Sequence, residues 1–471
     1  MRSRRPQPGH ARLKRSGGGA LLWLGAGFAL ALGCAPEGEA GRAGLDGGDL
    51  SPDAADVLPG TQATDPAKRE EAALLAASTL EVGFLLDRVG VLAHDDFQGR
   101  DNGTPGGAAA QAWLATDLAN QGLAPLAAAG YAIPFAAGVN LCAKVGGSDP
   151  TPTVGPDGVT RPLRDEVVVL GAHYDHLGDA DAPGSACKAA STATDRICNG
   201  AIDNAAGVAV AIAVARALAS SPSPLRRSLL LCLFDAEEDG LLGSKALVKA
   251  LEQNGVAGVK RSHVVAMLSV DNVGSQIIKG EPSSFATDAE FSDTLRAAVH
   301  AANAATGYQT WPVSSFFVGQ EGGGRSDHLP FRESGVPVLF LGSGSGAEYH
   351  TPTDEFDALD QAKLLAIARH AVVLVAAIAN ADAPPDFQAK PGPHLDDARA
   401  LVSLADRALG ASNPLQLNAT QREVVTTFRT QLQGWLDHPP SSDADWKAYQ
   451  TLVKAILAAV FSFVGGHGGP P

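Results

Sequence analysis

Six acidic or histidine residues of this chain stand at the ends of apolar segments, where side chains can converge on a metal ion. They are His173, Asp203, Glu237, Glu238, Asp271 and His350. Two imidazoles and three carboxylates from this set would give nitrogen and oxygen ligation without a thiolate. Such ligation suits a pair of co-catalytic zinc ions whose open positions hold a water, with one carboxylate left to act as a base. The set therefore predicts a hydrolytic metal centre.

Most of the six follow apolar segments that have the length of a buried strand. The segments are VVVL at 167–170, LLLCLF at 229–234 and VVAMLSV at 264–270. In open α/β sheets, residues beyond the carboxyl ends of the strands meet at one edge, so side chains far apart in sequence can share a site. Asp203 is expected instead at the start of a helix, DNAAGVAVAIAVARAL, where the helix dipole favours a carboxylate.

Seven stretches between about Asp96 and about Asn380 resemble, in family order, the signatures of the two-zinc exopeptidases. This family includes bacterial leucyl-type aminopeptidases, glutamate carboxypeptidases and, more distantly, glutaminyl cyclases. The stretches are DDFQGRDNGTPGG, GAHYDHLG, NGAIDNAAGVA, FDAEEDGLLGS, SVDNVG, SDHLPF and YHTPTDEFD. The resemblance implies a three-layer α/β/α fold with a central mixed, mostly parallel sheet, as in phosphorylase/hydrolase-like zinc exopeptidases.

The resemblance also implies a role for each residue of the set. The ligands of two zinc ions per chain would be His173, Asp203, Glu238, Asp271 and His350, with Asp203 bridging both ions. Glu237 would be the general base that takes a proton from water and returns it to the leaving amine. Asp175 would accept the ring N–H of His173 and fix the orientation of that imidazole. Three ligand carboxylates against two zinc ions leave about one positive charge to polarise a scissile carbonyl.

Further residues are candidates for the substrate pocket. They are Asp327 and His328 in SDHLPF, and Tyr349 beside His350. Asp327 and His328 can equally build the loop, and Tyr349, like Asp354, can serve as scaffold around His350. His176 is expected to be structural. The loop VSSFFV at 313–318 offers apolar surface and no cation, which favours leucine-like side chains in a substrate.

The N-terminus is expected to direct export. Six basic residues precede an apolar segment, ALLWLGAGFALAL, that is too short for a stable membrane span, which is typical of a signal peptide at 1–33. Its end, ALGC, resembles the bacterial lipoprotein processing site, so that Cys34 would carry a lipid anchor facing the periplasm or exterior; plain secretion is the alternative. Removal of 1–33 lowers the formal charge from −15 to about −21, so nucleic acid is excluded as a partner.

Export makes disulfides possible among the four cysteines that remain besides Cys34. Cys187 and Cys198 lie in a polar loop between two of the motifs, and oxidation would close a small ring there. We expect this disulfide. Cys142 and Cys232 lie in apolar, strand-like segments and are expected to be buried thiols.

Composition divides the chain into four parts. A flexible tether rich in Gly, Ala, Asp and Pro is expected at 34–78, and the catalytic domain at 79–384. The segment 385–471 begins with a Pro-rich break and contains three stretches with apolar residues at helical spacing, which predict a helical extension with a disordered Gly/Pro-rich tail.

The expected function is that of an exported two-zinc aminopeptidase acting on peptides or small amide substrates. A carboxypeptidase or dipeptidase on the same site, a glutaminyl cyclase, and a receptor-like protein without catalysis are the alternatives. Other chemistries lack their motifs, since the sequence has no HExxH, no serine at the centre of a G-x-S-x-G, no P-loop and no G-x-G-x-x-G after a strand.

Overall fold

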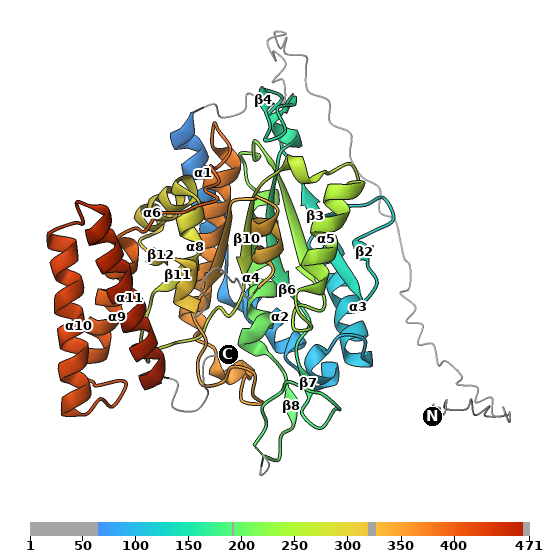
Figure 1. Ribbon diagram of the computed structural model, residues 1–471. Helices are drawn as coiled ribbons and strands as arrows, with labels where there is room; N and C mark the ends of the chain where they lie inside the picture. The colour runs from blue at the N-terminus through green and yellow to red at the C-terminus, as the bar shows by residue number, and fades with distance from the viewer. Residues whose placement is uncertain (1–64, 191–192, 319–325, 465–471) are drawn as a thin grey trace, which may run out of the picture. The chain divides into compact units, whose positions relative to one another are not determined.

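A nine-stranded sheet forms the centre of the protein in the computed structural model, which describes residues 65–190, 193–318 and 326–464 (Figure 1). The strand order is β1-β3-β9-β6-β10-β13-β11-β12, and β2 pairs with β3. The strands are Ala124–Pro125 (β1), Ala132–Pro134 (β2), Val139–Val145 (β3), Val167–His173 (β6), Ser228–Phe234 (β9), Val264–Val270 (β10), Ser284–Thr287 (β11), Thr310–Pro312 (β12) and Val338–Gly342 (β13). Two small hairpins lie outside it: Pro152–Val154 (β4) with Thr160–Pro162 (β5), and Gly178–Asp179 (β7) with Ile197–Cys198 (β8).

The four central strands of the sheet, β9, β6, β10 and β13, run parallel to one another. On their two sides, β3 and β11 run antiparallel to them. Side chains of β6 alternate between two hydrophobic clusters, with Val168 and Leu170 in one and Val167 and Val169 in the other. Since both faces of the strand are buried, it reads in the sequence as a continuous apolar segment.

Helices cover both faces of the sheet (Figure 1). On one face lie Pro66–Ser78 (α1), Val82–Leu92 (α2), Pro105–Asn120 (α3), Gly207–Ala219 (α4), Asp293–Thr306 (α6) and Gln361–Asn380 (α8). On the other lie Leu242–Gln253 (α5) and His328–Glu333 (α7). The predicted three-layer α/β/α fold with a mixed, mostly parallel sheet is therefore confirmed.

Helix α1 corrects the predicted extent of the flexible tether. Asp65 caps the helix by accepting the Ala67 N–H, and Pro66 occupies the first turn, where its missing N–H costs nothing. Small residues of α1 enter the main hydrophobic cluster, and the Arg69 guanidinium donates to the carbonyl of Asn380 at the end of α8. Part of the predicted tether at 34–78 is therefore a packed helix. The predicted signal peptide, Cys34 and the C-terminal tail lie outside the described residues.

The predicted C-terminal helical extension is present as Asp396–Leu409 (α9), Ala419–Asp437 (α10) and Asp443–Val464 (α11). Apolar side chains of the three helices form one cluster, which also takes in Phe316 and Phe317. The Asp397 carboxylate of α9 accepts both the N–H and the hydroxyl of Ser314, at 2.8 and 2.7 Å. The aromatic side chains of the loop 313–318 thus pack on the extension, which removes the support for a leucine-like substrate preference.

Two apolar segments in the described part of the chain, Ala201–Ala219 and Gln361–Asn380, have the length and hydropathy of a membrane span. Their windows are 94% and 72% buried inside the protein, respectively. Both are core helices that face the sheet and the helices beside it.

Candidate metal centre

The carboxyl ends of three adjacent parallel strands carry most of the predicted site. β6 ends at His173, β10 is followed directly by Asp271, and β9 is followed within four residues by Glu237 and Glu238. β6 pairs with β9 on one side and with β10 on the other, both in parallel register. The sheet therefore brings residues from three distant parts of the sequence to one edge.

A first group of ligand atoms is formed by His173, Asp203 and Asp271. The Nε2 atom of His173 lies 3.2 Å from Asp203 Oδ1 and 3.4 Å from Asp271 Oδ1. All three side chains are buried, and one ligand atom from each lies within 4.8 Å of the others.

A second group is formed by His350, Glu238 and the same Asp203. The Nε2 atom of His350 lies 3.3 Å from Asp203 Oδ2 and 3.4 Å from Glu238 Oε2. Asp203 thus turns one carboxylate oxygen toward His173 and the other toward His350. This is the arrangement that a carboxylate bridging two metal ions requires.

The backbone around Asp203 is held by a carboxylate from another part of the chain. Asp354 accepts the N–H of Ile202 at 2.7 Å and the N–H of Asp203 at 3.0 Å. Asp203 itself has non-helical φ and ψ of −113° and 88° within the irregular turn Ala201–Ala206 (η3), which precedes α4. Asp203 therefore lies at the start of the helical segment, as predicted, but in an irregular turn before the regular helix α4. The Asp354 carboxylate accepts from the backbone of Asp203, whereas the prediction made Asp354 a scaffold around His350.

Asp175 organises the segment that carries the two adjacent glutamates. Its two carboxylate oxygens accept the backbone N–H groups of Glu237 at 3.1 Å and Glu238 at 3.2 Å. Its Oδ1 also lies 3.7 Å from Nδ1 of His173, while the Asp175 backbone carbonyl oxygen is nearer, at 3.1 Å. One residue thus fixes both the imidazole and the turn after β9.

The electrostatics of the centre are those of a cation site. Burial raises the pKa of Glu237 well above its ordinary value and that of Glu238 to about 8, and neighbouring carboxylates add to both shifts. Burial also disfavours ionisation of Asp203, but His173 and His350 hold its pKa well below the ordinary value. A cation bound among these crowded, buried carboxyl groups would favour their ionised forms, whereas without it burial favours the protonated form of Glu237 and Glu238.

The donor set fits a divalent transition metal. In the described part of the chain, the ion pairs of the ligand carboxylates Asp203, Glu238 and Asp271 are all with histidines. Imidazole nitrogen with carboxylate oxygen, and no thiolate, suits zinc and related ions. Glu237 lies beside the ligand atoms of His173 and Glu238 and is available to exchange protons there.

His176 belongs to the centre, although the sequence reasoning treated it as structural. Its Nδ1 lies 2.8 Å from Glu238 Oε1, its ring is buried, and it contacts the His350 ring edge-on with the centroids 5.9 Å apart. With Asp203 and Glu238 it forms a further group of close ligand atoms. The spacing of three residues from His173 in GAHYDHLG was the signal that could have indicated this role.

The three residues predicted to line a substrate pocket have different surroundings. Asp327 and His328 are fully buried, and His328 Nε2 lies 3.2 Å from an oxygen of Asp288. Burial raises the pKa of Asp327 to about 7. Both residues thus lie inside the protein, where Asp327 directly precedes α7 and His328 is its first residue. Tyr349 stacks on the His350 ring with the centroids 3.8 Å apart, so it supports that residue.

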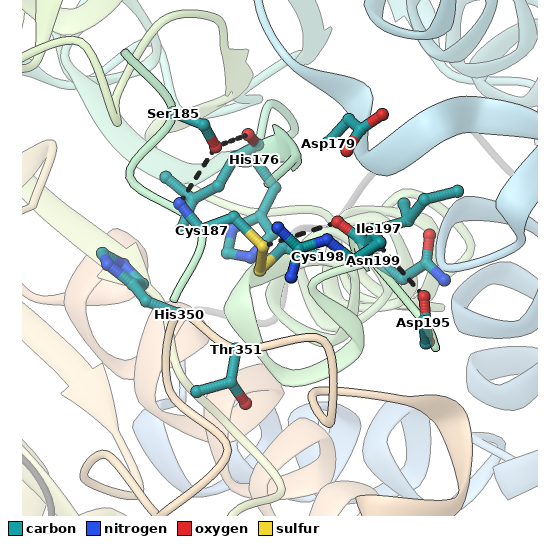
Figure 2. Close-up of a disulfide and its surroundings, with 12 residues drawn as sticks. His176, Asp179, Ser185, Cys187, Asp195, Ile197, Cys198, Asn199, His350 and Thr351 are labelled. Atoms are coloured by element: carbon teal, nitrogen blue, oxygen red, sulfur yellow. Dashed lines mark hydrogen bonds between the residues drawn. A yellow bond between two sulfur atoms is a disulfide. The ribbon is translucent and has the colours of Figure 1, made fainter. Parts of the chain in front are cut away.

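Two disulfides are present among the described residues. Cys187 and Cys198 are joined beside the metal centre, as Figure 2 shows. Cys142 and Cys232 are also joined, so the prediction of two buried thiols was wrong. These two residues face each other directly across the antiparallel pair β3 and β9. Their Cα atoms are 4.3 Å apart, as close as in a non-hydrogen-bonded cross-strand pair, and the sequence does not reveal that register.

Comparison with known proteins points to one family. Residues 157–375 match the model of Peptidase family M28. The chain is 30% identical over 171 residues to Aminopeptidase YwaD of Bacillus subtilis (strain 168), which covers 35% of this chain and 34% of that protein. The match thus spans about a third of the length of this curated relative.

Solved structures resemble the chain over a larger part of its length. LapA of Legionella pneumophila aligns with a TM-score of 0.50 at 18% identity, covering 66% of this chain and 77% of that chain. Glutaminyl cyclase of Porphyromonas gingivalis aligns with a TM-score of 0.44 at 20% identity, covering 63% of this chain and 97% of the cyclase chain. The likeness to LapA shows a shared fold. The stretch 157–375, which matches the model of Peptidase family M28, contains the six residues that the sequence predicts for the metal centre, and also His176.

Proposed function

We propose that this chain is a two-zinc aminopeptidase that removes residues from the free amino end of peptides. The observation that carries the proposal is the carboxylate of Asp203, whose two oxygens face two separate groups of ligands. A single tetrahedral ion needs four ligands, and this shared carboxylate together with the four residues around it makes five. The name of the curated relative, Aminopeptidase YwaD, supports the choice of the amino end.

The residues that would hold the two ions divide into two groups around Asp203. His173 and Asp271 lie on one side, and Glu238 and His350 lie on the other. Zinc bound there would act as a Lewis acid that polarises the scissile carbonyl and makes water more acidic.

The protein's own residues would carry the proton. Glu237 lies within the same group of close atoms as His173 and Glu238, and its backbone is fixed by the carboxylate of Asp175. Glu237 would take a proton from the attacking water and give it to the leaving amine, which is the work of a general acid–base residue. The buried position of Glu237, which is 7% exposed, limits competing water.

The location proposed for this activity is outside the cytoplasm. The basic and apolar segments before ALGC support export, and Cys34 would carry a lipid anchor that holds the enzyme at a bacterial membrane. Peptides or small amides are the proposed partners, and plain secretion is the alternative to the anchor.

Peptides with one blocked end test the proposed direction of attack. Free-amine peptides and amino-acid anilides should be hydrolysed by the zinc-loaded protein, and N-acetylated peptides of the same sequence should not. Release of C-terminal residues from N-acetylated peptides would contradict the aminopeptidase proposal and favour a carboxypeptidase. Conversion of N-terminal glutamine to a cyclic product without hydrolysis would favour a cyclase.

A further inference from the structure

The disulfide between Cys187 and Cys198 closes the connection between β7 and β8. Cys198 is in β8, and β8 pairs with β7, the short strand that follows His176. Figure 2 draws His176 and His350 among the surroundings of the disulfide. Each cysteine leads directly into a segment that contacts or contains a ligand of the second group, which consists of Asp203, Glu238 and His350.

The Cys187 end of the disulfide supports His350. The residue after Cys187, Lys188, donates its backbone N–H to the carbonyl oxygen of His350 at 2.7 Å. His350 has a φ of +60°, a left-handed conformation that a residue with a side chain rarely adopts. Such a conformation persists only where surrounding contacts fix it, and here the contacts are the Lys188 N–H on the backbone and the Tyr349 ring on the imidazole.

The Cys198 end leads to Asp203. The carbonyl oxygens of Asn199 and Gly200 accept hydrogen bonds from the buried guanidinium of Arg100, at 2.5 and 3.0 Å. The next residue, Ala201, donates its N–H to the backbone carbonyl of Asp354 at 3.1 Å. The segment from Cys198 to the bridging carboxylate is thus fixed along its whole length.

The two groups of ligands differ in what supports them. His173 and Asp271, which belong only to the first group, stand at the ends of β6 and β10 and are held by the sheet. His350, which belongs only to the second group, lies in a loop and is held by contacts with other loops. A loop ligand needs outside contacts to stay in place, and such supporting contacts typically change metal affinity by about 10- to 100-fold.

We propose that the Cys187–Cys198 disulfide is a positioning device for the second metal position. It holds the Lys188 N–H against His350 and ties that contact to the segment that carries Asp203. Loss of the disulfide would lower the metal affinity of the position formed by Asp203, Glu238 and His350 by about 10- to 100-fold. The position formed by His173 and Asp271 would stay filled. This inference rests on the proposed two-metal function.

Zinc affinity, measured by competition with a chromophoric chelator, tests the proposal without reference to activity. The double variant Cys187→Ser/Cys198→Ser should keep one tight zinc per chain and bind the second about 10- to 100-fold more weakly. The matched control is Cys142→Ala/Cys232→Ala, which removes the disulfide between β3 and β9 and should bind both zinc ions as the unmodified protein does.

A second pair of variants isolates the hydrogen bond and keeps the disulfide. Lys188→Pro removes the N–H and should lower the affinity for the second zinc ion. Lys188→Ala keeps the N–H and should leave that affinity unchanged. Unchanged affinity for both ions in the serine double variant, or equal affinities in Lys188→Pro and Lys188→Ala, would overturn the positioning role. An unmodified protein that binds only one zinc would instead overturn the two-metal function, so the two failures are distinguishable.

Discussion

Replacement of Asp354 should loosen the backbone that carries the bridging ligand. The Asp354 carboxylate accepts two buried N–H groups, those of Ile202 and Asp203, at 2.7 and 3.0 Å. A hydrogen bond to a charged group contributes about 1.5–3 kcal/mol, so Asp354→Ala should lower the free energy of unfolding by about 3–6 kcal/mol. Asp354→Asn keeps one carbonyl oxygen as acceptor and should lower it by about half as much.

The same change should weaken metal binding, because Asp203 contacts both ligand groups. We expect zinc affinity to fall by about 10- to 100-fold in Asp354→Ala, the effect typical of removing a residue that orients a ligand. Denaturant unfolding of the metal-free protein gives the stability, and a chelator competition gives the affinity.

The neighbouring carboxylate provides a matched control. Glu355 accepts one hydrogen bond from the Asn199 side-chain amide. Among the described residues it makes no hydrogen bond to Ile202 or Asp203. Glu355→Gln keeps an acceptor oxygen and should change stability by no more than about 0.5 kcal/mol. If Asp354→Ala matched Glu355→Gln in both stability and zinc affinity, the assigned role of Asp354 would be wrong.

Three further predictions concern the base, the extension and the anchor. Glu237→Gln should keep two zinc ions and lower kcat by about 10²- to 10⁴-fold. Glu238→Gln should instead lower the zinc occupancy measured by elemental analysis. Loss of zinc from Glu237→Gln but not from Glu238→Gln would mean that the two roles are reversed. Burial raises the pKa of Asp397 to about 8. A raised folded-state pKa favours folding below the unfolded value of about 3.9, and that contribution is lost as pH rises through about 8. Between pH 5 and pH 8, the free energy of unfolding should therefore fall less in Asp397→Asn than in the unmodified protein, as measured by denaturant titration. The same dependence of this free energy on pH in both proteins would refute the prediction. Cys34→Ala should move the protein from the membrane to the soluble fraction of its host, and an unchanged distribution would exclude the lipid anchor.

The sequence by itself determined the layers of the fold and the types of residue at the metal centre. Strands buried on both faces appear in the sequence as continuous apolar segments. The residue after such a strand lies at the carboxyl end of the sheet, and this placement does not depend on the other parts of the sequence. His173 and Asp271 could therefore be placed from local pattern alone. The amphipathic spacing of the C-terminal helices is local in the same sense.

Only the tertiary structure decided which side chains meet across loops. His176 contacts Glu238, and Asp354 holds Asp203 rather than His350; both pairings join residues at least 62 positions apart, and no local pattern records them. The disulfide between Cys142 and Cys232 depends on the register of β3 against β9, which is set by the packing of the whole sheet. The burial of Phe316 and Phe317 against the helical extension likewise depends on where that extension docks. Contacts between segments distant in sequence are decided by which packing buries the most apolar surface and pairs every buried polar group, and that is a property of the folded chain as a whole.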